Sequence, residues 1–127
     1  MTVTAAEIDV TSIADRYIAT WNETDAWQRR ALIEQTWVED GRYLDPMMSG
    51  EGHEGIDAMI AGVQARFPGF TFQRIGDVDA HNGCLRFSWV AGSEPGEAQV
   101  GGVDFGVLAG DRLQSITGFF DGSPDAE

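Results

Sequence analysis

The spacing of hydrophobic residues in the first half of the chain predicts three helices. The first helix spans about residues 5–22, behind a capping box at Thr4-Ala5-Ala6-Glu7. The second begins at Thr24 or Asp25 and ends near residues 39–41. The third has apolar residues at i, i+3, i+4 and i+7 and ends at Pro68-Gly69. Its apolar residues are Ile56, Met59, Ile60, Val63 and Phe67.

The second half of the chain has the pattern of β-strands joined by tight turns. Strands are predicted at residues 70–79, 84–91, 98–109 and 112–120, and Asn82-Gly83 is a strong hairpin signal between the first two. Glycines inside the third of these strands predict bulges or strong curvature. One earlier strand, at residues 42–45, is stopped by Pro46, and a Gly- and Ser-rich loop follows at residues 47–55.

This order of elements favours an α+β fold, a cone-shaped curved sheet, antiparallel or mixed, with three helices from the N-terminal half across its concave side. A bent sheet covered in this way leaves an interior pocket, and such pockets are usual ligand sites. One domain is expected over residues 1–127, with a core at about 8–120 and a flexible polar tail at 121–127.

The net charge of the chain argues against some classes of binding partner. The net charge is −13, and all eight basic residues are arginine. Such a surface repels phosphate backbones and anionic lipids, so nucleic acid and membranes are not expected partners. The lack of lysine excludes Schiff-base chemistry and a P-loop. No secretion signal or long apolar run is found, so a cytoplasmic location is expected.

Asp45 is the first candidate for chemistry because it ends a strand beside Leu44, Met47 and Met48. A carboxylate that loses water in apolar surroundings becomes a better base near neutral pH. The alternative is a surface aspartate that opens a turn before Pro46, which is a common use of this residue.

Asp104 interrupts an apolar strand, where aspartate is disfavoured. Gly102 and Gly106 share its face of the strand and leave space beside it, as expected for a carboxyl group in a pocket wall. Such burial is costly unless the group is paired, or protonated and hydrogen-bonded. The alternative is a solvated aspartate at a bulge or an edge.

Tyr17 lies on the apolar stripe of the first helix, where its hydroxyl could reach a polar site or a backbone carbonyl. His53 could cap the third helix or overhang the pocket, and His81 is expected at the surface. The two histidines lie far apart without a cysteine cluster, so neither a metal nor another cofactor is expected. Substrate contacts are predicted, with a core position as the alternative for each aromatic, at Trp21, Trp37, Met59, Val63, Phe67, Phe87, Trp89, Phe120 and His53.

The pattern resembles the nuclear-transport-factor-two-like superfamily, which includes ketosteroid isomerases, SnoaL-like polyketide cyclases and limonene-type epoxide hydrolases. Three short segments carry the resemblance: Asp-Arg-Tyr-Ile-Ala around Tyr17, Tyr-Leu-Asp-Pro around Asp45, and Gly-Val-Asp-Phe-Gly around Asp104. The resemblance covers about residues 8–120.

Comparison with the ketosteroid isomerases implies a role for each of three residues. Asp45 matches the base, Tyr17 matches a donor to the developing oxyanion, and Asp104 matches a second donor that is protonated. Ketosteroid isomerase is itself the standard example of an aspartic acid that stays neutral at pH 7, so this role for Asp104 comes from the resemblance alone.

Four positions depart from the patterns of this superfamily. Val63, and a residue near Trp37, stand where the isomerases have supporting tyrosines. Gly118 stands where the cyclases have an acid/base aspartate, and Gly102 where the epoxide hydrolases have an arginine.

The sequence therefore predicts a proton-transfer enzyme that acts on an apolar carbonyl compound, through isomerisation, cyclisation or elimination. Three alternatives remain: a non-catalytic protein that binds a small apolar or polycyclic ligand, an epoxide hydrolase-like enzyme, and a purely structural or partner-binding protein. A homodimer formed through the outer face of the sheet is also expected.

Overall fold

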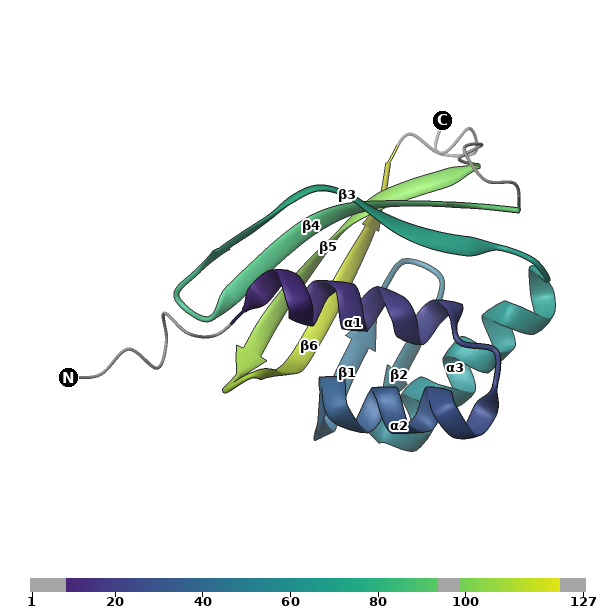
Figure 1. The fold of residues 1–127 in the computed structure, drawn as a ribbon, viewed down its shortest axis with the longest axis horizontal. Helices are drawn as coiled ribbons and strands as arrows, with labels where there is room; N and C mark the ends of the chain where they lie inside the picture. The colour runs from purple at the N-terminus through teal and green to yellow at the C-terminus, as the bar shows by residue number, and fades with distance from the viewer. Residues whose placement is uncertain (1–8, 94–98, 122–127) are drawn as a thin grey trace.

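The computed structural model describes residues 9–93 and 99–121. Three helices lie on one side of a strongly curved sheet of six strands (Figure 1). The predicted α+β fold with a curved, mixed sheet is confirmed. The predicted capping box at residues 4–7, the first residue of the strand predicted at 98–109 and most of the C-terminal tail lie outside the described residues.

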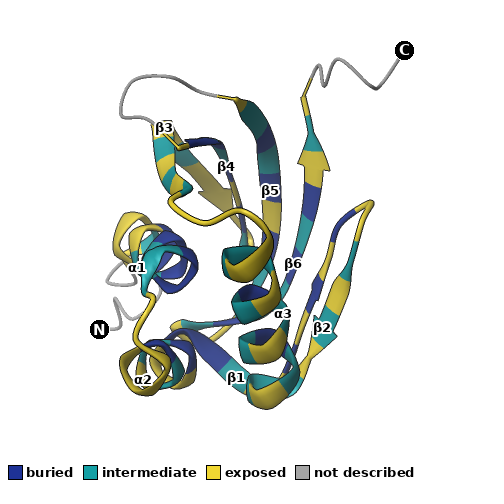
Figure 2. Ribbon diagram, turned by 90° about the vertical axis from the view of Figure 1, so that its right-hand side faces the viewer, coloured by how far each residue is buried: buried dark blue, intermediate teal, exposed yellow. Residues whose placement is uncertain are grey.

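Each of the first two helices begins at an aspartate whose side chain accepts a backbone N–H of the first turn. Asp9 caps α1 (Val10–Asn22) by accepting from the Ser12 N–H, and Asp25 caps α2 (Ala26–Thr36) by accepting from the Gln28 N–H. The third helix, α3, spans Gly52–Arg66. The buried side of α1 faces the sheet (Figure 2), and its large residues are Ile13, Tyr17, Ile18 and Trp21.

The sheet has the strand order β2-β1-β6-β5-β4-β3. Its strands are β1 (Trp37–Leu44), β2 (Ser49–Glu51), β3 (Thr71–His81), β4 (Cys84–Gly92), β5 (Val100–Ala109) and β6 (Arg112–Phe120). The β1–β6 pair is parallel and all the other pairs are antiparallel. The parallel pair places Leu44, at the end of β1, opposite Thr117 of β6, which pairs on its other side with Phe105 of β5. This register places Asp45 close to Asp104 across β6.

Four sequence-based boundaries are wrong. The first helix begins at Val10, after its Asp9 cap, rather than near residue 5, and the early strand begins at Trp37 rather than at residue 42. The second helix ends at Thr36 rather than near residue 40, because Trp37 already pairs with Leu113 of β6 and its side chain enters the core. The segment at residues 47–55, expected as a loop, contains β2, which pairs with β1 from Leu44 to Arg42, and the first turn of α3.

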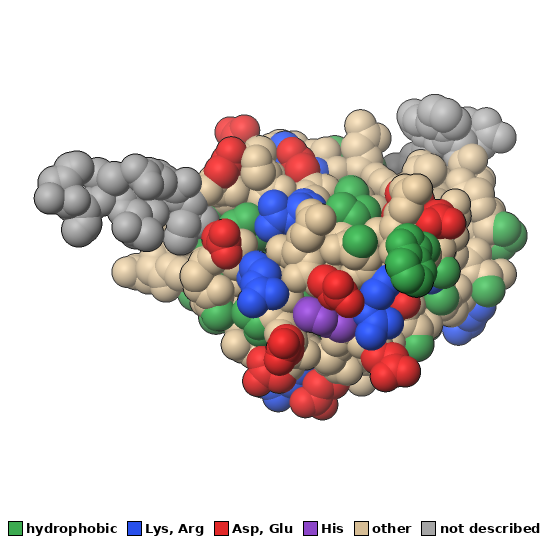
Figure 3. Space-filling model, turned by 60° about the horizontal axis from the view of Figure 1, so that its bottom comes forward, with side chains coloured by type: hydrophobic (Ala, Val, Ile, Leu, Met, Phe, Trp, Pro, Cys, Tyr) green, Lys and Arg blue, Asp and Glu red, His purple; other side chains and the backbone are tan. Residues whose placement is uncertain are grey.

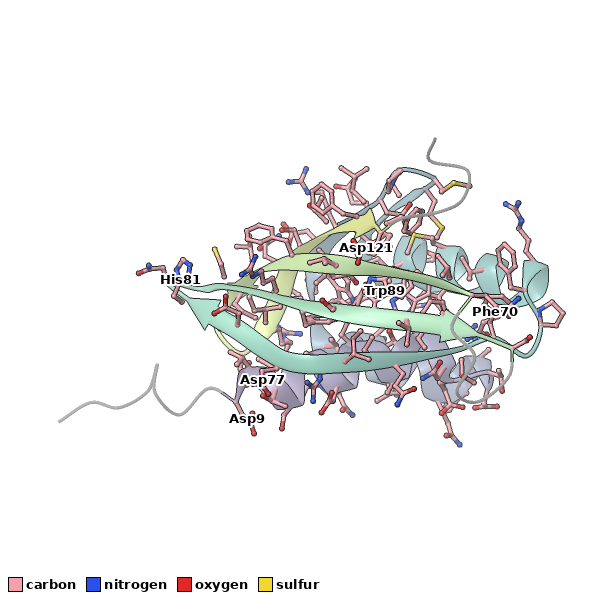
Figure 4. The ribbon with its side chains drawn as sticks, turned by 90° about the horizontal axis from the view of Figure 1, so that it is seen from above. Asp9, Phe70, Asp77, His81, Trp89 and Asp121 are labelled. Atoms are coloured by element: carbon pink, nitrogen blue, oxygen red, sulfur yellow. The ribbon has the colours of Figure 1, made fainter. Side chains whose placement is uncertain are left out.

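The predicted hairpin turn at Asn82-Gly83 is present. Both residues have positive φ, 51° and 78°, as a two-residue type I′ turn requires. Beyond the turn, the alternation in β4 buries Leu85, Phe87 and Trp89 on the helix side of the sheet. The hairpin tip with His81 lies at the far end of the sheet from Phe70 (Figure 4).

A buried arginine joins the three helices. The Nε atom of Arg29 on α2 donates to Asp57 of α3 at 2.6 Å. Its Nη1 atom donates to the Glu23 carbonyl after α1 and to Gln64 of α3, at 3.1 and 3.0 Å. Outside this contact, the face formed by α2 and α3 carries acidic and arginine side chains side by side (Figure 3).

Within residues 9–93 and 99–121, no helix of the protein is both long enough and apolar enough to span a membrane.

Candidate active site

Two carboxyl groups and two tyrosines, from one helix, two strands and a turn, meet on the concave side of the sheet. Tyr17 comes from α1, Tyr43 from β1, Asp45 from the turn after β1, and Asp104 from the middle of β5. All four side chains are buried, and Asp45 and Asp104 are only 7% and 4% exposed. They line one cavity, so a single small molecule could contact all of them.

Asp104 accepts a hydrogen bond at each of its oxygens. Tyr17 Oη donates to Oδ2 at 2.8 Å, and Trp89 Nε1 donates to Oδ1 at 3.2 Å. Burial raises the pKa of Asp104 to about 6; the two hydrogen bonds lower it and the charge of Asp45 raises it by smaller amounts. Loss of water therefore outweighs the two donors, and Asp104 changes protonation state close to neutral pH.

Asp45 is held by three donors. Oδ2 accepts from Tyr43 Oη at 2.5 Å, while Oδ1 accepts from the backbone N–H groups of Met47 and Met48 at 2.7 and 3.0 Å. The aspartate before Pro46 thus opens a turn, but it is buried in the cavity wall rather than exposed at the surface as the alternative interpretation expected. A carboxylate has about four acceptor positions, and three are used here, which leaves one for a ligand.

The two tyrosines remain protonated donors. Burial, followed by the nearby charge of Asp104, raises the pKa of Tyr17 and of Tyr43 well above the ordinary value. Each hydroxyl therefore has a hydrogen to donate to a carboxylate or to an oxygen of a ligand.

Gly118 of β6 provides the space in which these groups meet. A Cβ atom at this position would lie 2.8 Å from Asp104 Oδ1 and 3.3 Å from both Asp45 Cβ and Tyr43 Oη. Real Cβ atoms do not approach a carboxyl oxygen so closely. The absence of a side chain here is therefore a condition for the close approach of the two aspartates.

The cavity has a volume of about 500 Å³, within the roughly 300–1,000 Å³ range of small-molecule sites. Apart from the four polar groups described above, most of its wall is apolar. The remaining lining residues are Ile18, Trp21, Met47, Met48, Val63, Arg66, Phe67, Phe70, Phe72, Trp89, Gln99, Val100 and Phe120.

The structure brings the three predicted catalytic residues, Tyr17, Asp45 and Asp104, into one cavity wall. Of the predicted substrate contacts, five line the cavity: Trp21, Val63, Phe67, Trp89 and Phe120.

The other four predicted contacts lie elsewhere. Trp37 and Phe87 are core residues that pack edge-on against the Tyr17 ring. Met59 packs against the core, and His53 Nε2 lies 2.9 Å from the Trp37 carbonyl oxygen. Trp37 and Phe87 thus support the cavity wall from behind through Tyr17.

Tyr43 is a site residue that sequence reasoning missed. It lies two residues before Asp45, so the alternation of a strand places both side chains on the same face. That signal was present in the sequence. The contributions of Phe70, Phe72, Gln99 and Val100 depend on how β3 and β5 bend around the cavity, and no local pattern reveals this.

No three His, Cys, Asp or Glu side chains gather to hold a metal ion in the part of the chain that the structure describes.

Comparison with known proteins places the chain in a family. No family model and no curated protein matches the sequence. Among solved structures, a proposed isomerase of the SnoaL-like family from Agrobacterium tumefaciens is 43% identical, with a TM-score of 0.84 over 88% of this chain and 97% of that one. The chain belongs to the SnoaL-like family.

Two more distant structures share the fold of this SnoaL-like protein. A proposed polyketide cyclase from Sinorhizobium meliloti is 11% identical, with a TM-score of 0.67 over 84% of this chain and 93% of that one. A Catenulispora acidiphila protein with a ketosteroid isomerase-like fold, solved with trimethylamine, is 20% identical, with a TM-score of 0.69 over 84% of this chain and 82% of that one. The neighbours thus connect this fold with isomerases and cyclases.

The glycines at two positions of this SnoaL-like protein have steric causes. A Cβ at Gly102 would overlap the Phe119 carbonyl oxygen, so the backbone here admits no arginine of the epoxide hydrolase kind. The contacts of Gly118 likewise leave no room for a cyclase-type aspartate beside Asp104. The departure at Gly102 is therefore built into the backbone, and the departure at Gly118 follows from the side chains of Asp104, Asp45 and Tyr43 around it.

Proposed function

We propose that this SnoaL-like protein is an enzyme that transfers a proton within a small apolar carbonyl compound. The observation that carries the proposal is the 2.8 Å contact of Tyr17 Oη with Asp104 in the wall of a mostly apolar cavity that also contains Asp45. The isomerase and cyclase neighbours favour the same general chemistry.

In this mechanism Asp45 is the base. The free acceptor position of its carboxylate takes a proton from the carbon beside the carbonyl group, and the electrons of that C–H bond move onto the carbonyl oxygen. Asp45 then returns the proton to another atom of the substrate, so the reaction consumes no co-reactant. The Met47 and Met48 amides and Tyr43 hold the carboxylate in position throughout.

Tyr17 and protonated Asp104 are the donors to the carbonyl oxygen as it gains negative charge. In the free protein Tyr17 donates to Asp104, and the substrate oxygen would replace that contact by accepting from both groups. Donors aimed at a developing oxyanion in a water-poor site typically contribute about 10²–10³-fold each. Because the pKa of Asp104 is about 6, its donor form predominates below that pH in the free protein.

Exchange of substrate hydrogens with solvent tests the proposed base without requiring the natural substrate. We expect the wild-type protein to catalyse deuterium incorporation from D₂O next to the carbonyl of one or more members of a panel of cyclic enones, measured by NMR. Asp45→Asn should slow that exchange by about 10²–10⁴-fold, because the general base is removed.

Asp77→Asn is the matched control, since Asp77 lies on the outer stretch of β3 and does not line the cavity (Figure 4). It should exchange at the wild-type rate. Equal exchange rates for Asp45→Asn and wild type would remove Asp45 from the role of base.

A second candidate function is non-catalytic binding of an apolar ligand in the same cavity. It is favoured by Val63, which lies in the cavity wall at a position where the isomerases have a supporting tyrosine. Carboxyl NMR separates the two candidates: a raised Asp104 pKa favours catalysis, and an ordinary value near 3.9 favours binding alone.

A further inference from the structure

The two ends of the cavity differ in charge. Asp45 and Asp104 are buried at the inner end, whereas the exposed lining residues mark the mouth: Met47, Arg66, Phe67 and Gln99. Phe70, where the chain passes from α3 to β3, lies at the same end of the molecule (Figure 4). Arg66 is the one cation among the cavity-lining residues that the structure describes.

The guanidinium group of Arg66 has no carboxylate partner within 4.0 Å among the described residues. Its recorded contact is with the Phe67 ring, whose centroid lies 5.7 Å from Cζ. By contrast, four arginines form ion pairs with aspartate or glutamate: Arg29, Arg30, Arg74 and Arg86. Two others donate to neutral oxygens of the protein, Arg16 and Arg112. Arg42 likewise has no carboxylate partner among the described residues, but it is exposed on β1 and does not line the cavity.

The position of Arg66 in the last turn of α3 explains only part of this arrangement. A cation there interacts favourably with the helix dipole. That interaction does not occupy the N–H donors of the guanidinium, and it does not account for the position of the group at the rim of an apolar cavity. A guanidinium presents paired donors that match a carboxylate or a similar oxyanion, and contact with an aromatic ring restricts its movement.

The carboxyl groups at the inner end impose the orientation of a charged ligand. A negatively charged group would be repelled by Asp45 and attracted by Arg66, so it would remain at the mouth. The neutral carbonyl end of the same molecule would enter first and reach Tyr17. The apolar walls between the two ends would contact a hydrophobic body.

We propose that the ligand of this cavity is an amphiphilic acid, with an apolar body, a carbonyl group bound at the inner end and an oxyanion group such as a carboxylate bound by Arg66. The assignment of a carbonyl group at the inner end rests on the proposed proton-transfer function. The assignment of an oxyanion group at the mouth rests only on Arg66 and can be tested without catalysis.

Two fluorescent dyes with the same aromatic framework provide the test. The anionic dye 1-anilinonaphthalene-8-sulfonate carries a sulfonate that the neutral dye N-phenyl-1-naphthylamine lacks. Fluorescence titrations at low ionic strength would compare wild type with Arg66→Met. A second variant, Arg42→Met, is the control, because Arg42 is exposed on β1 and does not line the cavity. Val63→Trp fills the cavity and shows whether the dyes bind there.

Arg66→Met should weaken binding of the anionic dye about fivefold to tenfold, since an exposed charge-assisted contact is lost. It should leave the affinity for the neutral dye within twofold, Arg42→Met should change neither, and Val63→Trp should weaken both. Equal changes for the two dyes in Arg66→Met, no change for either, or no binding of either dye to wild type would overturn the proposal.

The two proposals fail in distinguishable ways. If the dye selectivity depends on Arg66 but Asp45→Asn exchanges at the wild-type rate, binding of an anionic group by Arg66 is supported and the role of Asp45 as base is contradicted. If the exchange depends on Asp45 but Arg66→Met leaves the selectivity intact, the assignment of an acidic substrate falls and proton transfer stands.

Discussion

At the scale of single residues, the protonation of Asp104 connects the site to the stability of the protein. Burial raises the pKa of Asp104 from 3.8 to about 6, so the folded protein binds this proton more tightly than the unfolded chain. The contribution of Asp104 to stability is thus fully present below about pH 4 and is lost as the pH rises through about 6. A shift of about two pKa units corresponds to about 3 kcal/mol.

Asp104→Asn should remove this pH dependence, because the amide keeps the shape of the carboxyl group without its charge. Urea unfolding of both proteins at pH 4, 5, 6 and 7 measures the effect. The free energy of unfolding of wild type should fall relative to that of Asp104→Asn by up to about 3 kcal/mol across this range. A difference between the two proteins that stays constant with pH would contradict the raised pKa.

The sequence reveals which residues of the site are unusual, but it does not reveal which contacts those residues make. Asp104 in an apolar strand and Asp45 before a proline are both recognisable because their residue types conflict with their surroundings. Trp89, by contrast, is an ordinary core aromatic in the sequence, and its hydrogen bond to Asp104 depends on the register in which Trp89 pairs with Gly102. Such a register is fixed by contacts between strands, which a single strand does not encode.

At the scale of elements, the Arg29 contact keeps the helices in place around the cavity. Gln64, which accepts from Arg29, also donates to the Trp21 carbonyl at 3.0 Å, and both Trp21 and Val63 line the cavity. Removal of the arginine would leave Asp57 and Gln64 without their main donor, while the Glu23 carbonyl would keep the Gln64 amide at 2.9 Å.

Arg29→Met should therefore lower the free energy of unfolding by about 3 kcal/mol, the lower end of the range for a broken buried ion pair, because Asp57 keeps a weaker contact with Arg30. Arg86→Met is the control: the Arg86–Asp79 pair is exposed, and its loss should cost less than about 1 kcal/mol. Chemical denaturation compares the two variants. Equal losses would show that Arg29 acts only as a surface charge.

The helices and hairpins of this fold follow from local sequence patterns, whereas the end of α2 and the edge strand β2 do not. The Asn82-Gly83 turn and the alternation of β4 are determined by neighbouring residues. The end of α2 and the existence of β2 depend instead on partners distant in the chain, Leu113 for Trp37 and the β1 backbone for residues 49–51. Tertiary pairing here overrides a helical pattern that would otherwise continue to residue 40.

At the scale of the whole molecule, the outer face of the sheet carries apolar side chains that no helix covers. Phe119, Phe105 and Leu44 are 56%, 40% and 54% exposed, and they lie on adjacent strands of the sheet. The pairing of Phe105 and Leu44 with the same residue, Thr117, places them in one row. We propose that a second copy of the chain covers this face.

Phe119→Glu should convert the expected dimer to a monomer, because a charge placed in an apolar interface loses its water without a partner. Analytical ultracentrifugation at several protein concentrations measures the change. Trp27→Glu is the control, since Trp27 is 85% exposed on α2, away from the sheet. A wild-type protein that sediments as a monomer at every concentration would contradict the proposal.

The missing side chain at Gly118 also limits how the chemistry of this pocket could change during evolution. An acidic residue at position 118 would collide with the carboxyl group already present at position 104. A lineage that moved its acid from one strand to the other would first have to shorten residue 104, and would pass through a protein with neither acid. Such an intermediate would keep Asp45 and Tyr17 but lack the second donor, at a cost of about 10²–10³-fold in rate. Proteins with the same pocket and weaker catalysis are therefore the natural neighbours of this protein in sequence space.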